Sequence, residues 1–167
     1  KAKEISSLYT LADVINAGCR DGELDVRGIS HRGYFASITD FKSYHDANMD
    51  LIDYKTATDL FHDNWPIYTR TNNSCPTHYF DTANVSNSVI SNGSMIEGTV
   101  ENSIVGRGCT IKKGAVIKNC VVLADCTIGE NVHIENLVVD KHAKITHAKE
   151  IIRPAGEPGY IKRNDTL

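Results

Sequence analysis

The 167-residue sequence lacks the features that mark several functional classes. Its five cysteines include no CxxC pair, so neither a zinc site nor a disulfide framework is indicated, and a reduced, cytoplasmic setting fits best. A net charge of −3, with no basic block, gives no support for nucleic-acid binding. No apolar run approaches membrane-spanning length, and no signal-peptide pattern is present. The first residue is Lys1 rather than methionine, so we expect a piece of a longer polypeptide.

What the sequence does contain is a repeated Asn-x-aliphatic-aliphatic phrase. Its copies begin at Asn87, Asn102, Asn119 and Asn136, at spacings of 15, 17 and 17 residues. Further aliphatics follow each phrase at six-residue intervals, namely Ile96, Ile111, Ile128 and Ile145, and then Ile117 and Ile134 in the two middle copies. A period of six inside a period near eighteen predicts hexapeptide repeats, which form a parallel β-helix, here of about four coils. Antiparallel strands joined by regular turns are the alternative.

The predicted fold class is therefore mainly β. Membership of the hexapeptide class, rather than the spacing itself, indicates a left-handed β-helix, against the usual right-handed crossover. Small residues recur four positions after the first ladder, as a narrow corner requires, at Ser94, Cys109, Cys126 and Ala143. Residues tolerant of positive φ supply the corners, at Asn92, Gly93, Gly106, Gly108, Gly114, Gly129 and Asn131. Cys109 and Cys126 could be bridged, but we expect free thiols in the core.

The segment before the coils is predicted to be a small α/β piece over residues 1–52. One helical face carries Leu8, Leu11, Val14 and Ile15, and Gly18 can end that helix. Short extended pieces are predicted around 24–26 and 34–38. Thr39 then offers an N-cap for a second helix with Asp40 in its first turn.

Three further segments complete the predicted organisation. Residues 53–84 form a connecting segment too aromatic for a flexible linker, so we expect it to be ordered and to pack along both neighbours. The β-helix is assigned to 85–152. A Pro/Gly-rich stretch follows, so 153–167 is predicted to be a C-terminal arm at the surface.

Two motifs upstream of the coils resemble a known family. The helix sequence SYHDANMDL at 43–51 and the phrase NWPIYT at 64–69, followed by hexapeptide coils, are similar to the C-terminal part of the glucose-1-phosphate adenylyltransferases. Asp13-Val14-Ile15 also resembles a family segment. The resemblance implies a first domain with a nucleotidyltransferase fold, whose C-terminal edge would be residues 1–52. For catalytic members it implies magnesium as the cofactor and ATP as a substrate, whereas no cofactor is expected in this segment.

One departure from that family pattern lies just before the second helix. Catalytic members carry Gly-Tyr-Trp-Arg-Asp-Val-Gly-Thr there, and the aspartate helps to hold magnesium. This chain has Ser37 in the aspartate's place and Ala36 in the arginine's. A serine hydroxyl brings no charge to a hard cation, so the resemblance implies that the metal role is lost, unless Asp40 has taken it over. The pattern resembles the GlgD type of glycogen biosynthesis protein, which associates with a catalytic subunit in a hetero-oligomer, expected to be a tetramer.

Other candidate sites lie on the coils. His133, His142 and His147 must be considered because hexapeptide acyltransferases use a histidine base, but each is predicted to lie outward among charged residues. Lys141 lies in a Val-Asp-Lys context similar to a family segment that contributes to an anionic effector site. The leading hypothesis is a regulatory subunit without catalytic residues in this segment, which also self-associates through its coils. A competent adenylyltransferase with displaced metal ligands and a hexapeptide acyltransferase are the alternatives.

Overall fold

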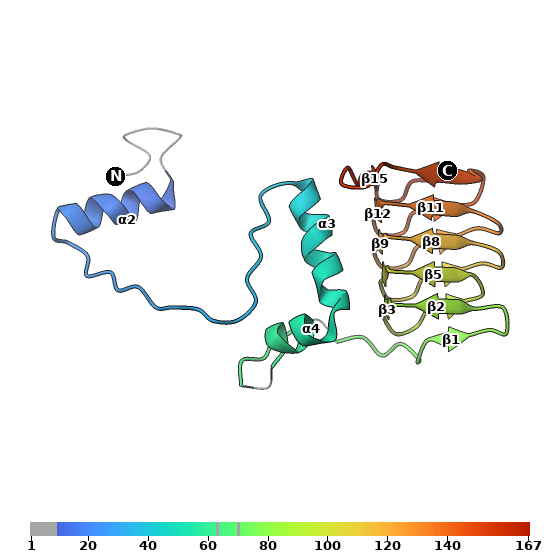
Figure 1. Ribbon diagram of the computed structural model, residues 1–167, viewed down its shortest axis with the longest axis horizontal. Helices are drawn as coiled ribbons and strands as arrows, with labels where there is room; N and C mark the ends of the chain where they lie inside the picture. The colour runs from blue at the N-terminus through green and yellow to red at the C-terminus, as the bar shows by residue number, and fades with distance from the viewer. Residues whose placement is uncertain (1–9, 63, 70) are drawn as a thin grey trace. The chain divides into compact units, whose positions relative to one another are not determined.

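The computed structural model describes residues 10–62, 64–69 and 71–167, and the chain divides into two units between Arg32 and Gly33 (Figure 1). In the first unit, α2 (Leu11–Arg20) begins at a capping box in which Thr10 and Asp13 exchange hydrogen bonds. The helix runs past Gly18, so the predicted end there is wrong. A Cβ at Gly18 would lie 2.6 Å from Leu24 Cδ1, so a larger residue there would require the Leu24 side chain to shift. Leu8 lies outside the described residues.

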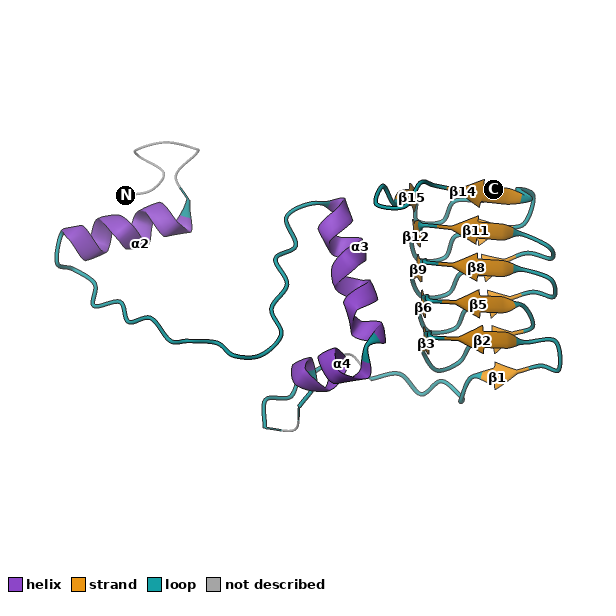
Figure 2. Ribbon diagram, in the orientation of Figure 1, coloured by secondary structure: helices purple, strands orange, loops and turns teal. Residues whose placement is uncertain are grey.

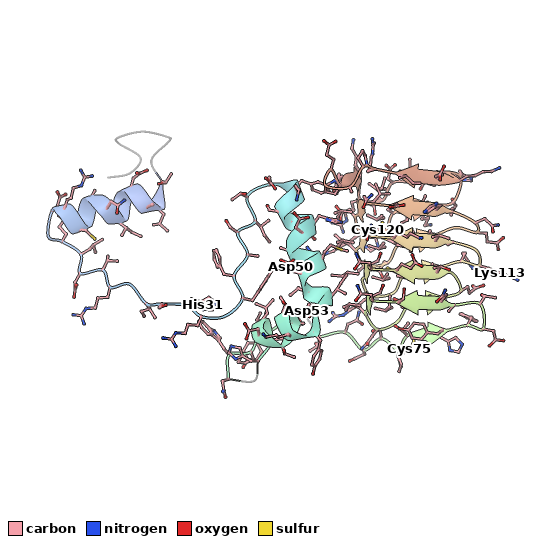
Figure 3. All side chains as sticks on the ribbon, in the orientation of Figure 1. His31, Asp50, Asp53, Cys75, Lys113 and Cys120 are labelled. Carbon is pink, nitrogen blue, oxygen red and sulfur yellow. The ribbon has the colours of Figure 1, made fainter. Side chains whose placement is uncertain are left out.

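In the second unit, residues 33–40 lead into a group of helices that precedes the coils. These are α3 (Phe41–Met49), the 3₁₀ turn η1 (Asp50–Ile52) and α4 (Tyr54–Leu60). Asp40, rather than the predicted Thr39, caps α3, because its carboxylate accepts the Ser43 N–H at 2.7 Å. The sequence prediction missed α4, which starts where the Asp53 carboxylate accepts the Thr56 N–H at 2.8 Å. Figure 3 labels Asp50 and Asp53 at the junction of these helices.

The extended pieces predicted at 24–26 and 34–38 are not β-strands in the described structure. A strand needs a neighbouring ladder, and no described strand pairs with either segment. Residues 34–38 instead run beside α3, where the Tyr34 hydroxyl donates to Asp50 Oδ2 at 3.0 Å. The aromatic side chains of the connecting segment are also not packed as predicted, since Trp65 is 73% exposed and Tyr68 is 91% exposed.

From His78 onward the chain winds as a left-handed parallel β-helix with three sheets (Figure 2). Sheet A contains β1 (His78–Tyr79), β4 (Met95–Ile96), β7 (Thr110–Ile111), β10 (Thr127–Ile128) and β13 (Lys144–Ile145). Sheet B contains β2 (Asn84–Ser86), β5 (Thr99–Glu101), β8 (Val116–Lys118), β11 (His133–Glu135) and β14 (Glu150–Ile152). Sheet C contains β3 (Val89–Ile90), β6 (Ile104–Val105), β9 (Val121–Val122), β12 (Leu137–Val139) and β15 (Gly159–Ile161). The predicted fold class is confirmed.

The core consists of the predicted aliphatic columns. In sheet A, Ile96, Ile111 and Ile128 are paired in register from coil to coil, and all three are fully buried. The sheet C ladder that starts at Ile90 is paired in the same way. In sheet B the predicted Ile117 and Ile134 continue a ladder that starts at Val85. Stacking like residues along a hydrogen-bonded ladder keeps each aliphatic side chain against its counterpart, so the repeat itself builds the core.

The coil corners only partly match the prediction. Gly93, Gly108, Gly114 and Asn131 have positive φ as expected. Gly106 does not, and it is glycine because a Cβ there would lie 2.8 Å from the backbone nitrogen of Ala124. The asparagine that opens each repeated phrase is itself a left-handed residue, with φ of 41° at Asn87 and 55° at Asn136. Its amide then links coils, as Asn102 Nδ2 donates to Asn119 Oδ1 at 2.7 Å.

The coil does not end at residue 152. After the Pro/Gly-rich stretch, β15 pairs in parallel with β12, and Thr166 forms a bridge to Lys144. Ile161 is 8% exposed and Leu167 packs against the core. The predicted surface arm is therefore wrong, because residues 159–167 cap the last complete coil and satisfy its exposed strand edges.

Helix α3 packs against the outer face of sheet C at β9 (Figure 2). Outward-pointing Val121 and Val138 are 0% and 2% exposed because α3 packs over this face. His45 of α3, only 9% exposed, places Nε2 at 3.0 Å from the carbonyl oxygen of Asn119. Among the described residues, no helix is long and apolar enough to cross a membrane.

Candidate functional site

The coil corner between sheets C and A carries Lys141, the predicted effector residue. Lys141 is exposed, and its backbone N–H donates to Asp140 Oδ1 at 2.7 Å. The hydrogen bond from the Tyr160 hydroxyl is the largest cause of the lowered pKa of the Asp140 carboxyl, and the charges of Arg163 and Lys141 lower this pKa further. The corner therefore places two cations around one carboxylate at the surface.

Tyr160 connects this corner to α3. Its hydroxyl donates to Asp140 Oδ2 at 2.6 Å, and this bond raises the pKa of the tyrosine. Its ring meets the Phe41 ring edge to face, with centroids 5.7 Å apart and planes at 76°. Sequence reasoning missed Tyr160, because the residue lies in the stretch predicted to be a free arm.

The segment that resembles the family's metal-binding phrase lies at the other side of α3. Ala36 lines an apolar cavity of about 420 Å³ together with Tyr34, Ile38 and residues of α3. Ser37 is exposed. In the part of the chain that the structure describes, neither Ala36 nor Ser37 contacts Lys141, so the structure does not bring these predicted site residues together.

Asp40, the remaining carboxylate of residues 33–40, is occupied as a helix cap. Its Oδ1 accepts the Ser43 N–H at 2.7 Å, and this bond is the largest cause of the lowered pKa of Asp40. A hard divalent cation needs several oxygen ligands, and these residues offer one carboxylate that is already bonded. They do not fit the magnesium ion that the family resemblance implies. Across the part of the chain that is described, no cluster of His, Cys, Asp or Glu is arranged to hold a metal ion.

The three candidate histidines lie on outer faces of the coils. The His133 ring is near two carboxylates, with Nδ1 at 3.6 Å from Glu150 Oε1 and Nε2 at 3.8 Å from Glu135 Oε2. His142 Nδ1 lies 3.7 Å from Asp125 Oδ2, and His147 is exposed. None of the three lines the apolar cavity beside Ala36 or a second, at the α3–sheet C junction, of about 570 Å³.

The coil cysteines are free thiols, as predicted. Cys109, Cys120 and Cys126 are buried, whereas Cys19 and Cys75 are exposed. The buried thiols donate to backbone carbonyls, for example Cys126 Sγ to the Asp140 oxygen at 3.0 Å. Burial raises the pKa of Cys120, labelled in Figure 3, to about 12. Such thiols serve as small core residues.

Comparisons with known proteins match this architecture. A family model described as GlmU-like, C-terminal hexapeptide matches residues 76–153. A glucose-1-phosphate adenylyltransferase of Geobacillus stearothermophilus is 42% identical over 86 residues, 52% of this chain and 22% of that protein. The glycogen biosynthesis protein GlgD of Bacillus subtilis (strain 168) is 38% identical over 133 residues, 80% of this chain and 39% of that protein. The chain belongs to the glucose-1-phosphate adenylyltransferase family.

Within this family, a third relative shows how much of the protein the chain represents. The glucose-1-phosphate adenylyltransferase of Bacillus mycoides (strain KBAB4) is 36% identical over 122 residues, 73% of this chain but 32% of that protein. The chain thus spans between about a fifth and two fifths of the family members named here. The chain contains the hexapeptide coils and α3, the helix that packs against them.

Proposed function

We propose that this chain is the β-helical part of a regulatory subunit in glycogen biosynthesis, which assembles with a catalytic glucose-1-phosphate adenylyltransferase. The catalytic partner would convert ATP and glucose 1-phosphate to ADP-glucose and pyrophosphate. The subunit's own role is to bind the partner and to change its response to effectors through contacts between subunits. A cytoplasmic setting, a tetrameric hetero-oligomer and self-association through the coils are parts of this proposal.

The single observation that carries the proposal is the composition of residues 33–40. Ser37 and Ala36 stand where the catalytic family pattern has an aspartate and an arginine, and Asp40 is used to cap α3. Similarity to a GlgD protein over 80% of the chain supports the same assignment. A subunit with these residues contributes little transition-state stabilisation of its own, because phosphoryl chemistry depends on cations placed at the reacting phosphates.

The test uses the full-length protein that contains this chain. The protein is assayed for ADP-glucose formation alone, then mixed with a purified catalytic subunit, in both cases with ATP, glucose 1-phosphate and magnesium. We expect negligible activity alone and a changed effector response in the mixture. Robust magnesium-dependent synthesis by the protein alone would overturn the proposal and favour the adenylyltransferase with displaced ligands.

Lys141 is proposed as part of an anionic effector site on the assembled enzyme. The exposed corner position and the exposed Arg163 support this, because both cations lie near enough to lower the pKa of the same carboxylate, that of Asp140. Lys141→Ala is expected to weaken the effector response of the assembly while basal turnover stays the same. Lys149→Ala, another exposed lysine on the coils, is the matched control. Unchanged effector affinity in Lys141→Ala would refute this assignment.

A further inference from the structure

Three side chains form a continuous connection between the Lys141 corner and the first turn of α3. Asp140 accepts the Lys141 backbone N–H through Oδ1 and the Tyr160 hydroxyl through Oδ2, at 2.7 and 2.6 Å. The Tyr160 ring then contacts Phe41, the first residue of α3. The residue before it, Asp40, caps the helix. Each step is a direct contact between neighbouring groups.

The connection reaches α3 at its N-terminal turn, which is held by fewer buried contacts than the next turn. One turn further along the helix, His45 is fixed against the Asn119 carbonyl at 3.0 Å and is 9% exposed. Phe41, by contrast, is 38% exposed and Tyr160 is 51% exposed. The first turn is therefore held by an exposed ring contact, and residues 33–39 lead directly into it. Helix termini held by few buried contacts open more readily than buried segments.

We infer that Tyr160 is a positioning residue, which transmits the charge state of the Asp140 and Lys141 corner to the first turn of α3. An additional negative charge at the corner repels the Asp140 carboxylate and weakens its bond to the Tyr160 hydroxyl. The Tyr160 ring then loses its fixed orientation against Phe41, and the first turn of α3 opens more often. The regulatory role of this connection rests on the proposed function, whereas the coupling between the corner and the first turn of α3 does not.

A double-mutant cycle on the full-length protein tests the connection. Lys141→Glu introduces a carboxylate beside Asp140, and Tyr160→Phe removes the hydroxyl that bonds to Asp140 while an aromatic ring remains at position 160. The readout is hydrogen–deuterium exchange of the Ser43 and Tyr44 amides, which bond to the side chain and the carbonyl of Asp40. Tyr79→Phe is the matched control, because Tyr79 is another strand tyrosine of the coils with 49% exposure.

We expect Lys141→Glu to speed exchange at these two amides about fivefold, the lower end of typical coupling between sites. In the Tyr160→Phe background the same substitution should have no further effect, whereas in the Tyr79→Phe background the fivefold change should remain. The amide of Thr127, which bonds to the Ala143 carbonyl in the middle of the coils, should be unaffected throughout. A general loss of stability would instead speed exchange at Thr127 as well.

Two results would overturn the inference. One is no change at Ser43 and Tyr44 when Lys141→Glu is introduced into the otherwise unchanged protein. The other is an equal change with and without the Tyr160 hydroxyl, since the coupling would then bypass Tyr160. Neither measurement involves a catalytic partner or ADP-glucose synthesis, so failure of the proposed function would be seen separately, in the activity assay.

Discussion

The register of the β-helix can be tested by one matched pair of isoleucine substitutions. Ile134 on β11 points into the core between Ile117 and Ile151 and is fully buried. Ile152, one residue after Ile151 on the neighbouring strand β14, points outward and is 45% exposed. Because side chains alternate along a strand, a slip of one residue would exchange the two environments.

The expected cost of Ile134→Ala follows from its burial. Removing three buried carbon groups costs about 2.4 kcal/mol at ~0.8 kcal/mol each. The cavity that remains in a tightly stacked column brings the total to about 3–4 kcal/mol. For a chain of this size that loss lowers Tm by roughly 6–16 °C. Ile152→Ala is expected to change stability by less than about 0.5 kcal/mol, because the side chain stays largely in solvent.

Guanidinium unfolding followed by circular dichroism measures both variants under the same conditions. The midpoint of Ile134→Ala should fall while the slope of the transition stays constant, since the surface exposed on unfolding hardly changes. If Ile152→Ala proves as damaging as Ile134→Ala, or more so, the assigned register of sheet B is refuted. Equal and small effects would show that the column is not packed as a core.

Three further outcomes are expected. In a thiol-labelling assay of the native chain, Cys19 and Cys75 should react, and the three buried coil cysteines should react only after unfolding. Burial raises the pKa of Cys120 to about 12, so rapid labelling of Cys120 would contradict its assignment to the core. Val121→Ala should lower the free energy of unfolding in urea by about 1.6 kcal/mol, from two carbon groups at ~0.8 kcal/mol each, because α3 buries this outward-pointing residue. Val89→Ala, at a position 42% exposed in the same column, should lower it by less, and equal effects would mean that α3 does not protect Val121. The bond between Asp140 and Tyr160 lowers the pKa of the carboxyl and raises that of the phenol, so its contribution to stability is fully present between pH 3.8 and pH 10.0, the ordinary pKa values of the two groups. The contribution is lost as the pH falls through the lowered pKa of Asp140, and again as the pH rises through the raised pKa of Tyr160. The tyrosinate absorbance of the unmodified chain minus that of Tyr160→Phe should therefore titrate above pH 10.0, and a midpoint at or below that value would argue against the bond.

Several missed features did leave a signal in the sequence. The adjacent aliphatics Val121 and Val122, and the run Leu137–Val139, indicate strands buried on both faces, which a half-exposed coil would not need. The Asp53 and Thr56 spacing is a usable N-cap signal for α4. No sequence signal indicated that Trp65 and Tyr68 are exposed, because an aromatic residue does not specify the surface against which it packs.

The sequence by itself determined the stacked coils. Each inward residue packs on the same position one coil away, so the spacing of Ile96, Ile111 and Ile128 already contains their contacts. Only the tertiary structure decided what lies outside the coils. The pairing of β15 with β12 spans the 22 residues from Val139 to Ile161 instead of the usual 17, and the contact of Tyr160 with Phe41 spans most of the unit. Such contacts join segments with unrelated local patterns, and their energy comes from burial between surfaces that no periodicity relates.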